Sequence, residues 1–154
     1  MKLKLSLLLN IIKFSMIRSR KESDIMAQKL IHGCIRVHDI DKTMKFYTEL
    51  FDFTVKREKK YPDFGFDLIY LTVPGSDFEI ELTYNYESEP YDIGNGFSHF
   101  AISVDDVEAM HKACLESEFE TTEMKSLSDG SVSYFFVTDP DGYRLEVMEH
   151  GALG

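Results

Sequence analysis

Two histidine–glutamate pairs are the residues of this sequence whose types and spacing could do chemistry. His32 and Glu81 are 49 residues apart, and His99 and Glu146 are 47 residues apart. Imidazole and carboxylate groups together are suitable ligands for a borderline divalent metal. Two of each leave two positions open in an octahedron, which favours a site that accepts a further ligand over a closed tetrahedral zinc site. We therefore predict that these four residues bind one divalent metal ion.

Elements in the order β-α-β-β-β must position the first pair. A helix is expected over 42–51, capped by Asp41, because apolar residues recur there at helical spacing. The Pro74-Gly75-Ser76-Asp77 segment predicts a turn before the fourth strand. Apolar runs predict the strands of this half at 30–37, 53–57, 66–73 and 78–84.

The same order of elements restarts at Phe97. A helix is expected over 107–117 after a cap at Asp105 or Asp106, and Asp139-Pro140-Asp141-Gly142 predicts a turn before the last strand. The strands of this half are predicted at 98–104, 119–124, 133–138 and 143–148.

Aligning the two halves supports an internal repeat. Residues 32–37 match 99–104, and residues 78–82 match 143–147, at offsets of 65 to 67 positions. Such self-similarity indicates a duplicated supersecondary unit. We predict an α+β fold of two tandem βαβββ modules, 28–86 and 97–150, within a single domain of residues 26–150.

Strand alternation predicts where the candidate ligands point. All four fall on the strand face opposite to the apolar residues that would cover a helix, so two curved sheets could converge on one ion. Arg36 and Asn85 stand four residues beyond His32 and Glu81 on the same faces, about 13 Å away, where they could hold the carboxylate end of a ligand. A surface salt bridge for Arg36 and a turn role for Asn85 remain the alternative.

Other residues of the same types are expected to have ordinary roles. A lone glutamate on a strand, such as Glu79, is typical of a solvated edge, and three histidines are expected to be satisfied polar residues: His38, His111 and His150.

Length and charge restrict the class of protein. The chain has 154 residues, which suits one domain, and a net charge of −10 from 27 acidic and 17 basic residues. This charge argues against a nucleic-acid partner. Cys34 and Cys114 have no paired spacing, which favours free thiols in a reducing cytoplasm.

The first 25 residues are basic, unlike the rest of the chain. Their apolar run at 5–12 is too short to span a membrane, and no cleavage site of small residues follows it. We expect residues 1–25 to be a dispensable extension, or the result of a translation start assigned too far upstream. A targeting signal or an amphipathic helix is the alternative. No membrane association is predicted for the domain.

Four stretches of the chain, spanning about residues 26–149, resemble glyoxalase I (lactoylglutathione lyase) of the vicinal oxygen chelate superfamily. They occur in the order LIHGCIRVHDIDKTMKFYTELFDF, EIELTYN, FSHFAISVDD and DPDGYRLEVME. The resemblance implies the glyoxalase/bleomycin resistance/dioxygenase-like fold and a homodimer. It further implies a metal at the subunit interface, with His32 and Glu81 from one chain and His99 and Glu146 from the other.

The resemblance also implies an activity. The family isomerises the hemithioacetal of methylglyoxal and glutathione to S-D-lactoylglutathione through an enediolate, which detoxifies methylglyoxal. It implies catalytic roles for Glu146, which moves the proton, and Glu81, and substrate contacts for Arg36, Asn85 and His99. The compact form of the chain resembles the class that prefers Ni²⁺, with Co²⁺ or Zn²⁺ as other candidates.

One departure and several rivals accompany this resemblance. The loop at 126–131 carries Asp129 where bacterial relatives have added positive charge, so another small thiol could replace glutathione. Rival functions are another metal-dependent superfamily enzyme, such as an epimerase, thiol transferase or extradiol dioxygenase, and a non-enzymatic small-molecule-binding protein. Glu81 argues against the rival enzymes, which resemble a three-ligand pattern or have Gln there. Metal content would distinguish the binding protein.

Overall fold

The computed structural model describes residues 28–127, 130 and 132–151. Contacts divide the chain after Leu30, and the unit Ile31–Gly154 holds all the helices and strands described below. The predicted extension 1–25 and part of the 126–131 loop lie outside the described residues. Within the ranges described, no helix is both long enough and apolar enough to cross a membrane.

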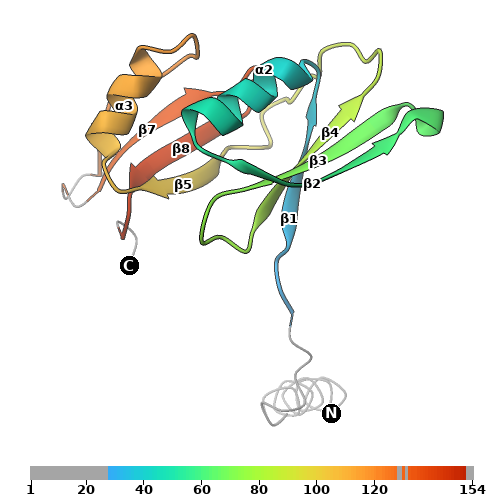
Figure 1. Ribbon diagram of the computed structural model, residues 1–154. Helices are drawn as coiled ribbons and strands as arrows, with labels where there is room; N and C mark the ends of the chain where they lie inside the picture. Colours follow the sequence, from blue (N-terminus) through green and yellow to red (C-terminus); the bar gives the residue numbers. More distant parts are fainter. Residues whose placement is uncertain (1–27, 128–129, 131, 152–154) are drawn as a thin grey trace, which may run out of the picture. The chain divides into compact units, whose positions relative to one another are not determined.

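The first module is a four-stranded sheet with one helix (Figure 1). The strand order is β1-β4-β3-β2, with β1 parallel to β4 and the other neighbours antiparallel. A π-helical turn, Phe46–Leu50, continues α2, and a 3₁₀ turn, Pro62–Phe64, joins β2 to β3. The elements are β1 (His32–Val37), α2 (Ile40–Lys45), β2 (Thr54–Tyr61), β3 (Phe66–Thr72) and β4 (Glu79–Asn85).

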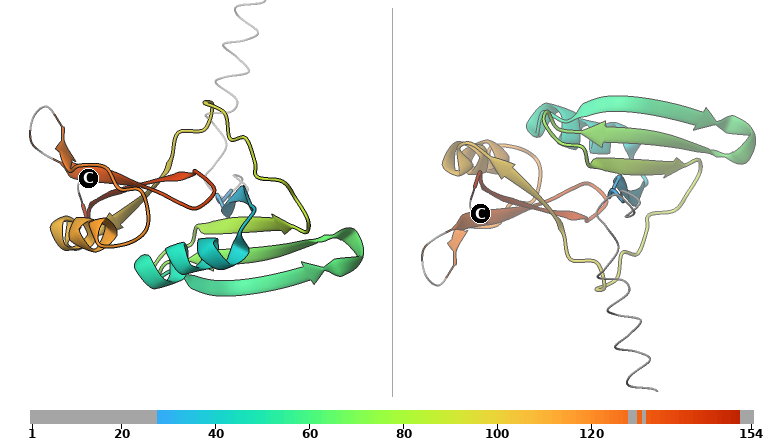
Figure 2. Two further views of the ribbon diagram at one scale, coloured as in Figure 1. Left: turned by 90° about the horizontal axis from the view of Figure 1, so that it is seen from above. Right: turned by 90° about the horizontal axis from the view of Figure 1, so that it is seen from below.

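The second module repeats this topology with the order β5-β8-β7-β6 and a parallel β5–β8 pair. Figure 2 shows each sheet with its own helix alongside it. The predicted α+β fold of two βαβββ modules is therefore confirmed. The elements are β5 (Phe100–Val104), α3 (Val107–Leu115), β6 (Lys125–Ser126), β7 (Ser133–Thr138) and β8 (Arg144–Glu149).

The caps of the two helices differ in how well the sequence predicted them. Asp106 caps α3 as expected, and its carboxylate accepts a hydrogen bond from Ala109 N at 2.8 Å. The prediction of Asp41 for α2 was wrong, because Asp39 is the cap and accepts from Lys42 N at 3.2 Å. Asp41 lies in the first turn instead, where its charge is favourable next to the helix N-terminus.

Two predicted strands have different bounds for a physical reason. β2 extends to Tyr61, well beyond the predicted 53–57. The prediction was too short because β2 is an edge strand, and its exposed charged residues show no alternation of apolar and polar side chains. The predicted strand 119–124 was wrong for most of its length. Only Thr121 forms a bridge there, to Val137, and the edge strand β6 contains two residues.

Alternating side chains place the core on one side of each sheet. In β1, Ile35 and Val37 are buried while Cys34 and Arg36 are exposed. One apolar cluster spans both modules and includes Leu82 from the first and Phe135 from the second. The predicted assignment of strand faces is therefore confirmed for β1, and the opposite face is left for polar side chains.

The turn before β8 ties the two modules together. The Asp141 carboxylate accepts hydrogen bonds from His38 N at 2.7 Å and from Thr43 Oγ1 at 2.9 Å. Gly142 adopts φ 95°, a left-handed conformation that favours glycine, and its N–H closes the predicted turn onto Asp139 O at 3.0 Å. These bonds fix the start of α2 against the C-terminal module.

Candidate functional site

The first predicted pair is in contact. His32 lies on β1 and Glu81 on the adjacent parallel strand β4, and His32 Nε2 is 3.4 Å from Glu81 Oε2. The side chains are 32% and 13% exposed, so both face the open side of the sheet without being fully solvated. We call this pair the N-terminal half-site.

The second predicted pair repeats the first. His99 immediately precedes β5 and Glu146 lies on β8, with His99 Nε2 3.1 Å from Glu146 Oε2. Their side chains are 32% and 16% exposed, close to the values of the first pair. We call this pair the C-terminal half-site, and its similarity to the first supports the internal repeat.

The two half-sites do not form one metal site within a single chain. In the part of the chain that the structure describes, no group of three or more His, Cys, Asp or Glu side chains could hold a metal ion. Convergence of the two sheet faces on one ion therefore stays a prediction for a site between two chains, as the resemblance implies. Each pair supplies half of the predicted ligand set.

The donor atoms present suit a divalent ion. Each half-site offers one imidazole nitrogen and one carboxylate, the combination that first-row divalent metals accept. His32 Nδ1 is buried and has no hydrogen-bond partner among the residues that the structure describes, so this imidazole has unused binding capacity. Nδ1 of His99 lies 2.8 Å from Ser98 Oγ, a contact that can orient the ring and leave Nε2 for a ligand.

Polar neighbours surround the Glu81 carboxylate. Tyr70 lies opposite Glu81 in the β3–β4 pair, Cys34 lies opposite it in the β1–β4 pair, and Thr83 Oγ1 lies 3.5 Å from its Oε1. Burial alone would raise the pKa of Glu81, but the bond from Tyr70 leads the effects that outweigh it and hold this pKa below its ordinary value. Glu81 is therefore kept ionised, as a metal ligand must be.

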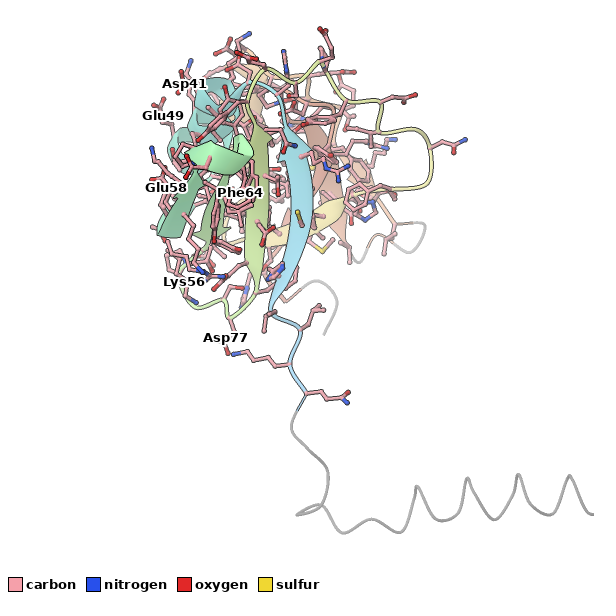
Figure 3. The ribbon with its side chains drawn as sticks, turned by 90° about the vertical axis from the view of Figure 1, so that its right-hand side faces the viewer. Asp41, Glu49, Lys56, Glu58, Phe64 and Asp77 are labelled. Atoms are coloured by element: carbon pink, nitrogen blue, oxygen red, sulfur yellow. The ribbon has the colours of Figure 1, made fainter. Side chains whose placement is uncertain are left out.

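Glu79 is not at a solvated edge, which corrects the sequence prediction. It is 6% exposed and pairs with Lys56 Nζ at 2.9 Å and with Arg57 Nη1 at 2.5 Å. A register irregularity between Val55 and Arg57 breaks the alternation of β2, which allows two consecutive cations to reach one carboxylate. Lys56 projects from this part of β2 in Figure 3.

Arg36 and Asn85 lie at the far end of the same sheet face, as predicted. Arg36 is exposed, and its backbone pairs in register with Thr83 of β4. Asn85 Nδ2 donates to the Tyr91 hydroxyl at 2.8 Å. Both side chains therefore lie on the Glu81 side of the sheet, displaced along the strands from the half-site.

The C-terminal module has a polar pair that the sequence interpretation missed. Ser103 and His150 occupy the positions that correspond to Arg36 and Asn85 in the repeat, and Ser103 Oγ lies 3.2 Å from His150 Nδ1. This contact agrees with the expectation that His150 is a hydrogen-bonded polar residue, but that expectation did not relate it to Asn85. The offset of the repeat, applied to Asn85, would have identified it.

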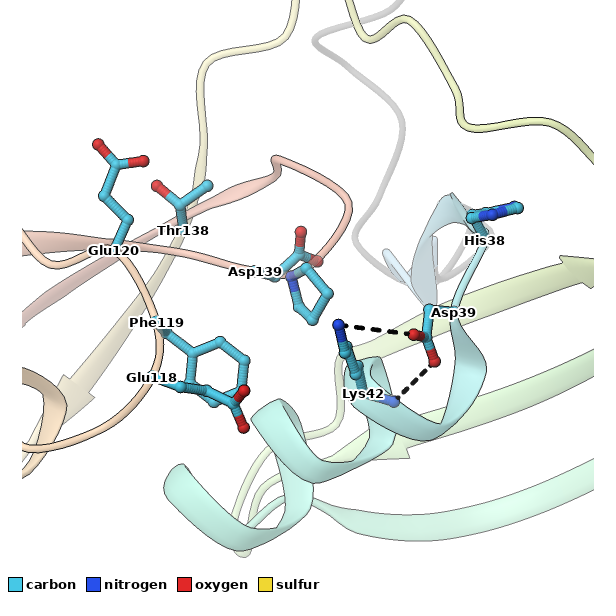
Figure 4. Close-up of a pocket in the computed structure, with 9 residues that line it drawn as sticks. His38, Asp39, Lys42, Glu118, Phe119, Glu120, Thr138 and Asp139 are labelled. Carbon is cyan, nitrogen blue, oxygen red and sulfur yellow. Dashed lines mark hydrogen bonds and ion pairs between the residues drawn. The ribbon is translucent and has the colours of Figure 1, made fainter.

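A cavity elsewhere in the unit does not contain the candidate ligands. A cavity of about 390 Å³ lies between the start of α2, the segment after α3 and the end of β7, and Figure 4 shows the residues that line it. Lys42 is its one basic side chain besides His38, and Lys42 Nζ lies 3.9 Å from Asp39. Because Glu118 and Glu120 add further negative charge to this lining, we assign the cavity no part in the site.

The geometry of the half-sites agrees with comparisons to known proteins. Residues 29–147 match the model of the Glyoxalase/Bleomycin resistance protein/Dioxygenase superfamily. The chain belongs to this superfamily. Superfamily membership accounts for the repeated sheet, and it implies a divalent metal.

Individual superfamily members give a closer comparison. A putative lactoylglutathione lyase of Brassica oleracea var. gemmifera is 39% identical over 80% of this chain and 45% of its own length. A probable lactoylglutathione lyase of Synechocystis sp. is 35% identical over 78% of this chain and 94% of its own length. The chain thus spans about half the length of the plant relatives it matches, and nearly all of the cyanobacterial one.

A solved superfamily structure matches the whole fold. The trypanothione-dependent glyoxalase I of Leishmania major has a TM-score of 0.71 and 32% identity, over 80% of this chain and 87% of that one. The sequence resemblance to glyoxalase I is therefore confirmed by independent comparisons of sequence and of structure.

Proposed function

We propose that this protein is a glyoxalase I, which isomerises the hemithioacetal of methylglyoxal and a small thiol to the S-D-lactoyl thioester. The observation that carries the proposal is the pair of matched His–Glu half-sites on the open sheet faces. The similarity to lactoylglutathione lyases along nearly the full length of the Synechocystis relative supports it.

We propose that His32, Glu81, His99 and Glu146 hold one divalent ion, with Ni²⁺ favoured. The ion would supply Lewis-acid stabilisation to the negative charge that develops on the substrate oxygens. Glu146 takes the proton from one substrate carbon and returns it to the neighbouring carbon, as a positioned carboxylate can do. Glu81, next to His32 in the other module, would balance part of the charge of this ion.

The site requires a second copy of the chain in this proposal. Because the described residues of one chain form two separate half-sites, a homodimer in which each N-terminal half-site meets the partner's C-terminal half-site would complete two ligand sets. A two-fold symmetric dimer makes both sites by the same contact.

We propose that Arg36 and Asn85 bind the thiol part of the substrate. The exposed guanidinium of Arg36 can pair with a carboxylate, which glutathione carries. The amide of Asn85 is already oriented by Tyr91. The Leishmania relative is described as trypanothione-dependent, so the thiol is a variable of this family that an assay of several thiols must determine.

We propose the cytoplasm as the compartment. Among the described residues Cys34 and Cys114 are both free, which agrees with a reducing environment.

Mixing two inactive variants tests the proposal. Glu81→Gln and Glu146→Gln chains each disable every site in their own homodimers. A heterodimer of the two contains one intact site and one doubly altered site, so a fully exchanged equal mixture should regain about a quarter of wild-type activity with methylglyoxal and glutathione.

Controls make this result specific. Each variant alone should stay inactive, and a mixture of Glu81→Gln with His32→Ala, which affect the same half-site, should also stay inactive. Failure of the first mixture to regain activity after verified subunit exchange would contradict a site shared between chains. Wild-type protein that holds metal but turns over no hemithioacetal with any thiol would contradict the function itself.

A further inference from the structure

The two half-sites differ in how their carboxylates are held. Glu81 has three hydroxyl or thiol side chains around it in addition to His32: Tyr70 and Cys34 in register on the neighbouring strands, and Thr83 Oγ1 at 3.5 Å. Cys34 Sγ and Thr83 Oγ1 are also 3.3 Å from each other, so these two groups form a connected cluster with the carboxylate. The Glu146 carboxylate has its ion-pair contact with His99 Nε2 at 3.1 Å.

The strand register shows that this difference is systematic. Tyr70 lies directly opposite Glu81 in the β3–β4 pair, and Phe136 lies directly opposite Glu146 in the β7–β8 pair. Cys34 pairs with Glu81 across the parallel strands, and Ala101 pairs with Glu146. Each hydroxyl or thiol donor near Glu81 thus has an apolar counterpart near Glu146.

The third donor follows the same pattern. Thr83 is two residues beyond Glu81 on β4, and Met148 is two residues beyond Glu146 on β8. Side chains two apart on a strand share a face, so Met148 takes the place of the threonine hydroxyl. All three hydroxyl or thiol side chains near Glu81 are thus replaced by apolar side chains near Glu146.

Both aromatic rings are held in the same way despite this difference. The Tyr70 and Phe136 rings lie edge-on to His32 and His99, with ring centroids 5.8 Å and 5.4 Å apart. Arg57 lies 3.6 Å above the Tyr70 ring, and Arg144 lies 3.9 Å above the Phe136 ring. Since both rings lie beside a histidine and beneath an arginine, the hydroxyl of Tyr70 is the difference between them on the side of the carboxylate.

The network behind Tyr70 makes its position firm. Arg57 is fixed by its ion pair with the buried Glu79, at 2.5 Å. A cation held over an aromatic ring is attracted to the ring face, which restricts the ring's position. The Tyr70 hydroxyl on the side of Glu81 therefore belongs to a ring whose rotation is restricted.

We propose that Tyr70 is a positioning residue that, with Thr83 and Cys34, fixes Glu81 as the stationary carboxylate of the site and leaves Glu146 free to move with the proton. This inference rests on the proposed function, because it assigns unequal roles to the two carboxylates of one site. It accounts from this chain's own residues for why Glu146 is the proton carrier.

Exchanging the hydroxyl between the half-sites tests the inference. In Tyr70→Phe, Glu81 loses an orienting donor, and the affinity of the dimer for Co²⁺, followed by visible absorption during titration of the metal-free protein, should fall about ten-fold or more. In Phe136→Tyr, a hydroxyl is placed opposite Glu146. We expect kcat of the loaded enzyme to fall about ten-fold with KM unchanged, and Co²⁺ affinity not to fall.

Tyr84→Phe is the matched control. It also deletes a tyrosine hydroxyl, but Tyr84 lies on the face of β4 opposite to Glu81. It should change neither quantity, and circular dichroism should show that all three variants are folded. Wild-type Co²⁺ affinity in Tyr70→Phe, or wild-type kcat in Phe136→Tyr, would overturn the inference. An inactive wild-type enzyme would instead contradict the proposed function, and the Co²⁺ titration would still report on Tyr70.

Discussion

The Tyr47 hydroxyl donates a hydrogen bond to Asp139 Oδ2 at 3.1 Å, and it does so across the boundary between the two modules. Tyr47 is 1% exposed and Asp139 is 4% exposed. Burial raises the pKa of Asp139 to about 6, although hydrogen bonds from Tyr143 N, Tyr47 and Asp141 N act in the opposite direction. The hydrogen bond therefore joins the two modules, and the free energy needed to bury the ionised Asp139 carboxylate makes the stability of the fold depend on pH.

This pKa predicts a stability change between pH 4 and 6. The pKa of Asp139 is raised from 3.8 to about 6 in the folded chain, so its contribution to stability is fully present below pH 3.8 and is lost as the pH rises to 6. Asp139→Asn should remove this loss of about 2–3 kcal/mol from the pH dependence of the free energy of unfolding. Urea unfolding at several pH values measures it. The exposed Asp63→Asn control should keep the wild-type pH profile, and the same profile in Asp139→Asn would contradict the prediction.

Removal of the proton carrier should abolish turnover without disturbing assembly. Glu146→Gln keeps the size of the side chain but removes its basicity, so kcat should fall by about 10²- to 10⁴-fold while the dimer persists. Thioester absorbance measures turnover and light scattering measures mass. Glu149→Gln, at an exposed position on the same strand, should keep wild-type kcat. Turnover near that of wild type in Glu146→Gln would refute its role.

The identity of the ion is a separate prediction. Two imidazoles and two carboxylates with two open positions suit octahedral ions, so chelated protein should regain more activity with Ni²⁺ or Co²⁺ than with Zn²⁺. Reconstitution at equal metal content, verified by elemental analysis, makes the comparison. A clear preference for Zn²⁺ would reject the assignment to the compact nickel-type class.

Contact between the modules can be tested at a glycine. A Cβ added at Gly33 would lie 3.0 Å from Cε1 of the Phe100 ring, whereas one added at Gly96 would meet nothing within 4 Å. Gly33→Ala should therefore lower the free energy of unfolding by about 1–3 kcal/mol relative to Gly96→Ala. Both variants restrict the unfolded chain equally, so their difference isolates the contact. Equal stabilities in urea would mean that Phe100 moves aside freely.

The sequence predicted the site residues better than their supports. His32, Glu81, His99 and Glu146 were recognised because their offsets repeat and because alternation along one strand assigns a face without knowledge of its neighbours. The role of Tyr70 could not be predicted in this way. Its contact with Glu81 depends on the register between β3 and β4, which loops and tertiary packing determine.

Charged edge strands and caps caused the errors in the fold. β2 has the sequence TVKREKKY, whose charged residues gave no apolar alternation after Val55. The environment of Glu79 was missed with it, since both of its cation partners lie on β2. At the start of α2, Asp39 and Asp41 are both acceptable caps by residue type, and only the backbone geometry selects Asp39.

The placement of the two thiols gives this protein one natural site for attaching a fluorescent label. Cys34 is exposed on the face that carries Glu81, while Cys114 is fully buried; burial raises the pKa of both thiols, that of Cys114 to about 11. A maleimide fluorophore added at mildly alkaline pH would therefore attach next to the N-terminal half-site without any engineered cysteine. Its emission would report metal loading and subunit exchange directly, in the native sequence and in real time.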